Sequence, residues 1–572
     1  MIPRHPPRVA GAARLLSIFA IALIACAPIG AFADSARPAV AHKGAVASAY
    51  PLASQAGQEI LKEGGNAFDA AVAVAAALAV VEPSSSGLGG GGFFLLHRQS
   101  DGFETMLDAR EKAPGAATRD MYLDKAGNPT RGSTDGPLSA AIPGEPAAFE
   151  YLARKYGKLP LKQSLQPAIR LAREGFPVYL RLQYGIKAKR EILARSPDAA
   201  KAFLTADGNA PEIGAIIKQP ELANTLEAIA NQGAKGFYEG RVAENLVSGV
   251  RAGGGIWTLE DLKNYRVVER KPLVGEYHGA RIVTAPPPSS GGIAVLDSLN
   301  ILDGFDLRDV DSATRKHLIV EAMRRAYRDR AIFLGDPDFI KMPLQQLMSV
   351  DYAAGQRSSI RADKAMPSDL LPGIESEPKG MNTTHFSVLD AAGNRAAVTI
   401  TVNLFFGNGY IPTGTGVLLN NEMDDFSAKP GTPNAFGLIG NTANSIAPNK
   451  RSLSSMSPTF VETSKGMMVI GSPGGSTIIS QVLLGVLNYV DGMSAADIVK
   501  YPHYHHQYQP DELGYEQGAL SESEIAKLQS MGHKLRLSNR QWGNMQVITW
   551  DFASGKVEAA SDPRGEGEGL VY

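Results

Sequence analysis

The segment from Ala67 to Val81 carries alanine and valine on every face of a predicted helix. A helix that is apolar all round is buried on most of its faces, so we expect this one to lie inside the protein. A preceding helix is expected over 53–63, with Gly64-Gly65-Asn66 between the two. A glycine-rich run, 83–92, and a predicted strand, 93–96, follow the apolar helix. This helix–loop–strand order is the reverse of the strand–loop–helix order of dinucleotide and P-loop sites, so we exclude a nucleotide site.

Length and composition describe a soluble globular protein. At 572 residues the chain exceeds what one ordinary core supports, which by default indicates two or more domains. Its hydrophobic content of 44% and charged content of 20% are typical of folded proteins rather than disordered ones. A net charge of −1 gives no electrostatic reason to expect nucleic acid or an anionic membrane surface as a partner.

Residues 1–33 have the pattern of a secretory signal peptide, outside the mature fold. Basic residues precede an apolar run, Leu15 to Ile29, and Ala31-Phe32-Ala33 is a small-x-small cleavage site. The run is shorter than the ~20 residues of a spanning helix, so we expect no integral transmembrane span. Leu23-Ile24-Ala25-Cys26 also resembles a bacterial lipobox, which leaves removal or lipidation of Cys26 as alternatives. Removal would leave a mature protein without cysteine, which suits an oxidising periplasm.

The middle of the chain is predicted to be mainly helical. Several helices are expected between Pro143 and Val250, and one strand over 274–283. One helix is predicted over 312–333, with Ser312 as its N-cap. Polar residues and prolines over 355–379 are typical of a flexible linker. The helix also carries four arginines that we expect to form a solvated face with local ion pairs, namely Arg324, Arg325, Arg328 and Arg330.

Hairpins dominate the prediction for the last third. Residues 384–390 and 396–403 alternate like strands, and Ala391-Ala392-Gly393-Asn394 between them is a good hairpin turn. Another hairpin is expected from 460–462 and 467–470, followed by a helix over 478–490.

Thr383 stands at the start of the first of these strands. A threonine hydroxyl is a weak nucleophile unless a base lies beside it, and cleavage of the Asn382–Thr383 bond would supply the freed α-amine as that base. An α-amine titrates near ~8, so at neutral pH part of it could accept the hydroxyl proton. The alternative is an ordinary strand that begins with polar residues, and this segment alone does not decide between the two.

Three downstream segments favour the catalytic interpretation: Asn420-Asn421-Glu422-Met423-Asp424-Asp425-Phe426-Ser427, Ser454-Ser455-Met456-Ser457-Pro458, and Gly471-Ser472-Pro473-Gly474-Gly475-Ser476. Together with Met381 to Asp390, in this order and spacing, they resemble the γ-glutamyltransferase (γ-glutamyltranspeptidase) family of N-terminal-nucleophile enzymes. The resemblance extends over nearly the whole chain after the leader. It implies an α+β fold, the four-layer α-β-β-α sandwich of that superfamily, with which the strand and helix pattern is compatible.

The resemblance implies a precursor that cleaves itself. The large subunit would be residues 34–382 and the small subunit 383–572, folded together as a heterodimer. Thr401, on the partner strand of the hairpin, would hydrogen-bond the Thr383 hydroxyl, unless it is an ordinary strand threonine. Gly474 and Gly475 would donate two backbone N–H groups to the oxyanion, each worth ~3 kcal/mol of barrier, unless they form a plain tight turn.

A glutamyl substrate carries an α-carboxylate and an α-ammonium, so its pocket needs both a cation and anions. By resemblance Arg110 would bind the carboxylate, since its planar fork suits bidentate recognition. Ser454 and Ser455 would add hydroxyl donors to the same carboxylate. The ammonium would be bound by three acceptors, Asn403, Glu422 and Asp425. The alternative for each of these residues is an ordinary surface polar side chain.

Phe436 departs from the bacterial pattern. It lies in 433–440, which resembles the lid over the glutamyl site, where many relatives carry tyrosine. Phenylalanine can cover the pocket with an apolar ring but cannot donate a phenolic hydrogen bond. We therefore expect a looser lid and a bias toward hydrolysis over transfer.

Two further segments could be mistaken for chemical sites. His503, His505 and His506 lack a nearby cysteine or HExxH spacing, and the family has a similar histidine-rich run with no catalytic metal, so we expect no metal site. Gly565 to Gly569, alternating glycine with glutamate, is expected to be a surface loop. No metal or organic cofactor is implied.

These inferences together predict a periplasmic or secreted, self-processing γ-glutamyltransferase and glutathione hydrolase. Its co-substrate would be water, or the amine of an amino acid or short peptide. A cephalosporin or glutaryl acylase on the same scaffold is the nearest alternative, because a fold does not determine a substrate. Asp425 favours a substrate with an α-amino group, which glutaryl compounds lack. A non-catalytic extracytoplasmic protein that binds γ-glutamyl peptides is a second alternative.

Overall fold

The computed structural model describes residues 40–371 and 383–572. The predicted signal peptide, Cys26, Asn382 and the second half of the predicted linker lie outside these residues. Within the described ranges, none of the helices combines the length and the apolar character that crossing a membrane requires.

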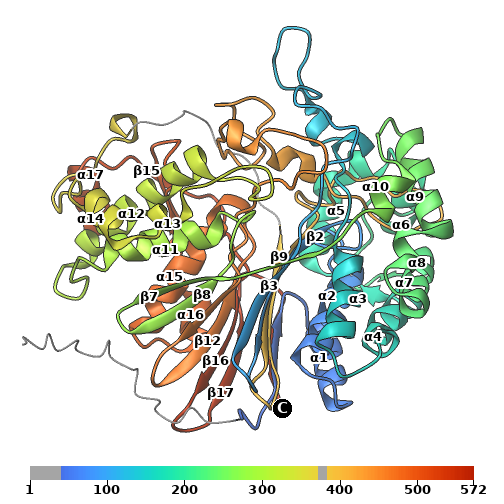
Figure 1. Ribbon diagram of the computed structural model, residues 1–572, viewed down its shortest axis with the longest axis horizontal. Coiled ribbons are helices and arrows are strands. Elements are labelled where there is room, and N and C mark those ends of the chain that lie inside the picture. The colour runs from blue at the N-terminus through green and yellow to red at the C-terminus, as the bar shows by residue number, and fades with distance from the viewer. Residues whose placement is uncertain (1–39, 372–382) are drawn as a thin grey trace, which may run out of the picture. The chain divides into compact units, whose positions relative to one another are not determined.

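Two antiparallel sheets form the centre of the structure (Figure 1). Over the described residues the first sheet has seven strands, in the spatial order β18 (Glu568–Val571), β1 (Ala45–Ser48), β9 (Thr384–Leu389), β10 (Arg395–Thr401), β2 (Gly91–Arg98), β3 (Phe103–Ala109) and β6 (Val268–Arg270). Over the same residues the second has six, in the order β17 (Val557–Ser561), β16 (Gln546–Asp551), β12 (Gly466–Gly471), β11 (Thr459–Glu462), β8 (Ala280–Thr284) and β7 (Leu273–Tyr277). The sheets face each other, with β9 packed on β12 and β16.

Helices cover the outer face of each sheet, which completes the four layers (Figure 1). The helices beside the seven-stranded sheet are α1 (Pro51–Lys62), α2 (Ala67–Val81), α3 (Glu145–Lys155), α4 (Leu161–Glu174), α5 (Leu180–Leu193), α6 (Pro197–Phe203), α7 (Pro220–Gln232), α8 (Lys235–Tyr238), α9 (Gly240–Ala252) and α10 (Leu259–Lys263). Those beside the six-stranded sheet are α11 (Gly291–Leu302), α12 (Ser312–Phe333), α13 (Leu344–Leu347), α14 (Val350–Arg357), α15 (Ile478–Val490), α16 (Ala495–Lys500) and α17 (Glu522–Ser530). The predicted α+β sandwich is confirmed.

Two small sheets accompany the main layers. One contains β13 (Tyr504–His505), β14 (Leu513–Tyr515) and β15 (Leu535–Leu537), and the other β4 (Phe176–Pro177) and β5 (Ile216–Ile217).

The apolar helix α2 shows why the layers form. All 15 of its residues are buried, as the all-round alanine and valine pattern predicts. It packs against α1 and α4 on one side and against β9 and β10 on the other. Its start is fixed by a capping box, in which Asn66 Oδ1 accepts from the Asp69 N–H (3.1 Å) and Asp69 Oδ2 accepts from the Asn66 N–H (2.9 Å). This helix therefore supports the hairpin that begins beside Thr383.

Two predictions about local structure are wrong in detail. The segment 274–283 forms two strands, β7 and β8, because His278 (φ 47°) and Gly279 (φ 77°) turn the chain between them. The helix α12 has the predicted bounds, but its N-cap is Asp311, whose Oδ1 accepts from the Thr314 N–H (3.2 Å). Ser312 is the first helical residue, since the extended backbone that a cap requires occurs at Asp311.

The prediction of a solvated arginine face on α12 is also wrong. Arg324, Arg325 and Arg330 are at most 5% exposed. Glu321 receives Arg324 at 3.2 Å and Arg325 at 2.7 Å, and Asp511 also pairs with Arg324. The helix packs against α11 and α17, so acids from other segments replace the water that a surface arginine would contact.

The segments predicted as a linker and as a glycine–glutamate loop are partly regular. Of residues 355–371, the first three belong to α14, and Ser368 is fully buried, with its N–H donated to Asp511 Oδ2 (3.1 Å). The rest of the predicted linker, 372–379, lies outside the described residues. Glu568 to Val571 form the edge strand β18, because Gly569 allows the chain to approach Ala559 so closely that a Cβ would stand 2.4 Å from its backbone.

Candidate active site

Thr383 directly precedes β9, and Thr401 ends β10 beside it in the hairpin. Their hydroxyl oxygens are 3.4 Å apart, and both side chains are buried. Thr401 Oγ1 also accepts from the Asn403 N–H (2.8 Å). Because that N–H occupies one acceptor position, the proton of the Thr401 hydroxyl can be donated to Thr383 Oγ.

A small cavity beside Thr383 gathers nearly all the predicted site residues. Its lining includes Arg110, Thr401, Asn403, Glu422, Asp425, Phe436, Ser454, Ser455 and Gly475. Arg110 follows β3, Glu422 and Asp425 belong to the 3-10 turn η4 (Glu422–Asp425), and the serines precede β11. Segments separated by more than 300 residues thus meet at one hydroxyl group.

Arg110 is the central cation of this pocket and is fully buried. Its guanidinium donates to Asp425 Oδ2 (2.5 Å) and to Glu422 Oε1, and lies 3.6 Å from Glu111 Oε2. Burial alone would lower the pKa of Arg110, but the carboxylates of Glu422, Asp425 and Glu111 raise it above its ordinary value. The arginine is therefore permanently charged and is presented by carboxylates that a substrate carboxylate would rearrange.

Two buried acceptors in the pocket have no donor within the described residues: Asn403 Oδ1 and Glu422 Oε2. Burial raises the pKa of Glu422 well above its ordinary value, although Arg110 opposes this shift. Buried acceptors without donors are costly, and an ammonium group, with three donors, would satisfy both. This independent observation supports an ammonium position next to Arg110.

Arg330 is a pocket residue that the sequence reasoning missed. It lines the cavity, and its Nε donates to Ser290 Oγ (3.0 Å) while its Nη2 donates to Ser455 Oγ (3.4 Å). Burial lowers its pKa to about 10, so it still carries its charge at neutral pH. The predicted carboxylate end of the pocket therefore has two arginines, and one of them orients Ser455.

Phe436 covers the cavity from a loop anchored by Asn434. Asn434 Oδ1 accepts from the N–H groups of Phe436 (3.0 Å) and Leu438 (3.1 Å), and its Nδ2 donates to Asp425 Oδ1 (3.2 Å). The Ala435 N–H donates to Asp424 Oδ2 (2.8 Å). The predicted lid segment is thus tied to the same acidic turn that pairs with Arg110.

Gly474 and Gly475 form the tight turn that leads into α15. A side chain on Gly474 (φ +139°) would approach Thr477 Oγ1 to 2.5 Å, and one on Gly475 (φ +55°) would approach Phe436 Cδ1 to 2.3 Å. Neither N–H donates a hydrogen bond within the part of the chain that the structure describes. Two adjacent donors beside Thr383 have the composition of an oxyanion-binding site.

The three histidines considered above have separate partners. His503 Nδ1 bonds to the Trp542 carbonyl (3.0 Å), His505 Nδ1 to Ser480 Oγ (2.9 Å), and His506 Nε2 to Asp511 (3.2 Å).

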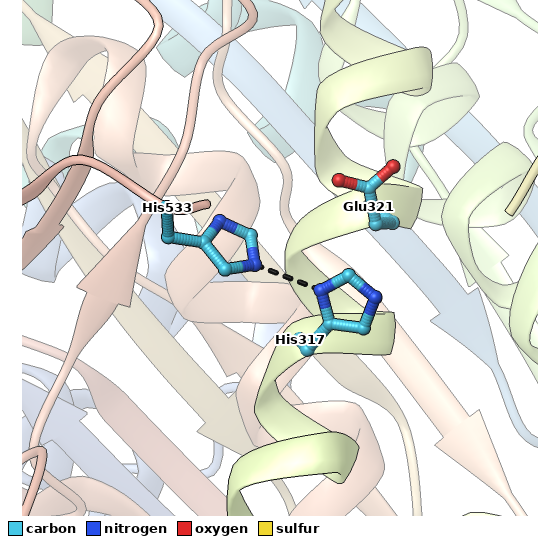
Figure 2. Close-up of side chains that lie close together, drawn as sticks. All are labelled: His317, Glu321 and His533. Atoms are coloured by element: carbon cyan, nitrogen blue, oxygen red, sulfur yellow. Dashed lines mark hydrogen bonds between the residues drawn. The ribbon is translucent and has the colours of Figure 1, made fainter. Parts of the chain in front are cut away.

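Another group, His317, Glu321 and His533, brings its ligand atoms within 4.8 Å of one another (Figure 2). His317 Nε2 bonds to the Arg361 carbonyl (2.7 Å), which leaves its Nδ1 to accept from His533 Nε2 (2.8 Å). The Glu321 carboxylate points away from this pair in Figure 2 and is used by two arginines. Hydrogen bonds and ion pairs within the protein therefore occupy the atoms that a metal would need.

The chain matches known proteins along nearly its whole length. The gamma-glutamyltranspeptidase family model matches residues 53–572. The glutathione hydrolase proenzyme of Escherichia coli (strain K12) is 44% identical over 98% of this chain and 98% of its own. That of Bacillus subtilis (strain 168) is 38% identical over 93% and 92%, respectively.

Solved structures agree with this result. Cephalosporin acylase from Bacillus halodurans has a TM-score of 0.81 at 29% identity, covering 95% of this chain and 99% of that protein. Gamma-glutamyltranspeptidase from Helicobacter pylori has a TM-score of 0.56 at 42% identity, covering 57% of this chain and 94% of that chain. The family resemblance drawn from the motifs is confirmed: this chain belongs to the gamma-glutamyltranspeptidase family.

Proposed function

We propose that the chain is a self-processing γ-glutamyltransferase and glutathione hydrolase with Thr383 as its nucleophile. The observation that carries this proposal is the pocket itself, in which a buried threonine hydroxyl, a charged arginine and two acceptors without donors line one cavity. The match to glutathione hydrolase proenzymes supports the same activity.

In the processing step, Thr383 Oγ attacks the carbonyl carbon of Asn382. The acyl group moves from the threonine nitrogen to its oxygen, and water then hydrolyses the ester. The products are a large subunit ending at Asn382 and a small subunit, 383–572, whose Thr383 has a free α-amine.

In turnover, the freed α-amine accepts the proton of Thr383 Oγ as this oxygen attacks the γ-carbonyl of the donor. The N–H groups of Gly474 and Gly475 stabilise the oxyanion, each worth roughly 3 kcal/mol. The proton passes to the leaving nitrogen, and a γ-glutamyl ester remains on Thr383. Water or a second amine then attacks this ester and regenerates the hydroxyl. Thr401 positions Thr383 Oγ through the hydrogen bond at 3.4 Å.

Recognition of the glutamyl group divides the pocket into two ends. Arg110, Ser454 and Ser455 bind the α-carboxylate, and Asn403, Glu422 and Asp425 bind the α-ammonium. The ammonium end favours γ-glutamyl over glutaryl substrates. The structural likeness to a cephalosporin acylase concerns the fold, which different substrates share.

The first experiment is the intact mass of the purified protein under denaturing conditions. Two chains that join at Asn382–Thr383, and one chain from a Thr383→Ala variant, are expected. A wild-type chain that stays uncut after long incubation would contradict the nucleophile assignment. A comparison of γ-glutamyl and glutaryl anilides then tests the substrate, and faster turnover of the glutaryl compound would favour the acylase alternative.

The mature enzyme is proposed to be periplasmic or secreted, with residues 1–33 removed. The mass of the large subunit tests this as well. A chain starting at Asp34 indicates cleavage after Ala33, whereas a lipid mass on Cys26 indicates an anchored form.

A further inference from the structure

A second cavity, of about 580 Å³, adjoins the active site at the oxyanion turn. Gly474 lines this cavity, and the next residue, Gly475, lines the pocket that contains Thr383. We call the second cavity the groove. Four separate segments form it, through Leu180, Arg181 and Tyr184 of α5, Phe405, Arg540 with Trp542, and Glu566.

The groove contains charges that the protein does not neutralise. Over residues 40–371 and 383–572, neither Arg181 nor Arg540 makes an ion pair, and Arg181 Nε has no hydrogen-bond acceptor. Arg181 instead lies 6.0 Å from the centre of the Phe405 ring. Glu566 accepts the Leu180 N–H at its Oε1 (3.2 Å), while its buried Oε2 has no donor in the described residues.

The groove also exposes apolar surface at its mouth. Leu180 is 64% exposed and Tyr184 59% exposed, on adjacent turns of one helix. Trp542 is largely buried, and its indole N–H has no acceptor within the described ranges. Large exposed apolar side chains around a concave site are typical of ligand-binding surfaces.

We propose that the groove binds the amine substrate of the transfer reaction, an α-amino acid or short peptide with a free carboxylate and an apolar or aromatic side chain. The carboxylate lies on Arg181 and Arg540, and the side chain lies over Tyr184 and Phe405. The ammonium group is drawn by Glu566 before it loses its proton.

The proposal rests on the acyl-enzyme chemistry described above and assigns it a second substrate site. The neutral amine nitrogen attacks the carbonyl carbon of the glutamyl ester, a C–N bond forms, and the ester C–O bond to Thr383 Oγ breaks. The proton of the amine passes to Thr383 Oγ through the α-amine. By microscopic reversibility the same groove holds the leaving peptide of the donor.

The position of the groove supports this assignment. The γ-carbonyl carbon must lie beside Thr383 and the two glycine N–H groups, with the glutamyl moiety in the pocket. The substituent on the scissile nitrogen must therefore leave the pocket past this turn. Gly474 is the residue that connects the turn to the groove.

The test uses a chromogenic γ-glutamyl anilide as donor and two acceptors, L-phenylalanine and L-phenylalaninamide. Arg181→Gln/Arg540→Gln is expected to raise the KM for phenylalanine roughly tenfold while the KM for the amide stays constant, since only the acid has a carboxylate to lose. Hydrolysis of the donor without acceptor should be unchanged, because the anilide carries no carboxylate. Arg241→Gln, which removes an exposed charge outside the groove, is the matched control.

Binding without turnover separates this proposal from the proposed function. Ligand-observed NMR on the Thr383→Ala chain should show phenylalanine bound more tightly than its amide, with the difference abolished in the double arginine variant. Equal binding of acid and amide, or an unchanged KM in the double variant, would overturn the groove assignment. A wild-type enzyme that fails to hydrolyse the donor would overturn the proposed function, while the binding result would still judge the groove.

Discussion

The ring of Phe436 lies against the backbone of Gly475, so that a Cβ built on Gly475 would stand 2.3 Å from Phe436 Cδ1. Gly475 is also in the left-handed region, with φ +55°. The lid residue and the predicted oxyanion donor therefore fit together only because position 475 has no side chain. This contact links closure of the lid to the geometry of the oxyanion turn.

Replacing Gly475 with alanine should impair catalysis more than folding. The methyl group forces either the lid or the turn to move, and loss of one oxyanion donor typically lowers kcat about 100-fold. We expect a fall of that size for γ-glutamyl anilide hydrolysis, measured on the cleaved enzyme. Gly240→Ala is the matched control, since Gly240 has φ +63° with open space around its Cβ position. Equal losses in both variants would assign the effect to backbone strain alone.

Replacing Phe436 with tyrosine should favour transfer over hydrolysis. The ring is 4% exposed over the pocket, and the added hydroxyl can donate one hydrogen bond that holds the lid closed against water. One net hydrogen bond of about 1 kcal/mol corresponds to a change of roughly fivefold in the ratio of transfer to hydrolysis. Product analysis with one donor and one acceptor measures this ratio. An unchanged ratio, with Phe339→Tyr as the exposed control, would refute the looser-lid hypothesis.

Local patterns were sufficient for the elements that carry the nucleophile. The β9–β10 hairpin and the buried helix α2 were predicted from alternation and composition, because each depends on residues close in sequence. The turn at His278 and Gly279 was missed, since a non-glycine residue at positive φ leaves a weak signal. Short motifs also indicated which side chains line the pocket, but only through the family resemblance.

Features that depend on distant segments could not be predicted in this way. Arg330 looks like a surface residue in its own helix, and only the packing of α12 places it against Ser290 and Ser455. The groove draws on α5, the turn after β12 and two loops near the C-terminus. No single segment has the composition of a binding site, so the site exists only in the folded chain.

Replacing Arg330 with lysine should weaken donor binding. Lysine keeps the charge but cannot donate to both Ser290 Oγ and Ser455 Oγ with the same planar geometry. Loss of an oriented hydroxyl at the carboxylate end should raise the KM for γ-glutamyl anilide roughly tenfold with a smaller effect on kcat. Arg328→Lys on the same helix, whose side chain lies outside the pocket lining, is the control. A lower kcat with an unchanged KM would mean that Arg330 does not act through the carboxylate.

Buried histidines should make the protein sensitive to acid. Burial lowers the pKa of His385, on β9 next to the nucleophile, to about 3. Because the folded pKa is below the unfolded value, the stability that neutral His385 contributes is fully present above pH ~6.5 and is lost as the pH falls toward 3. At pH 4 this histidine alone should cost about 3 kcal/mol of unfolding free energy relative to pH 7. His385→Gln, in the uncut Thr383→Ala background, should flatten the pH dependence by that amount in urea titrations at the two pH values. His278→Gln, at a partly exposed turn, should leave it unchanged, and an identical slope in both variants would show that His385 is not the group that titrates.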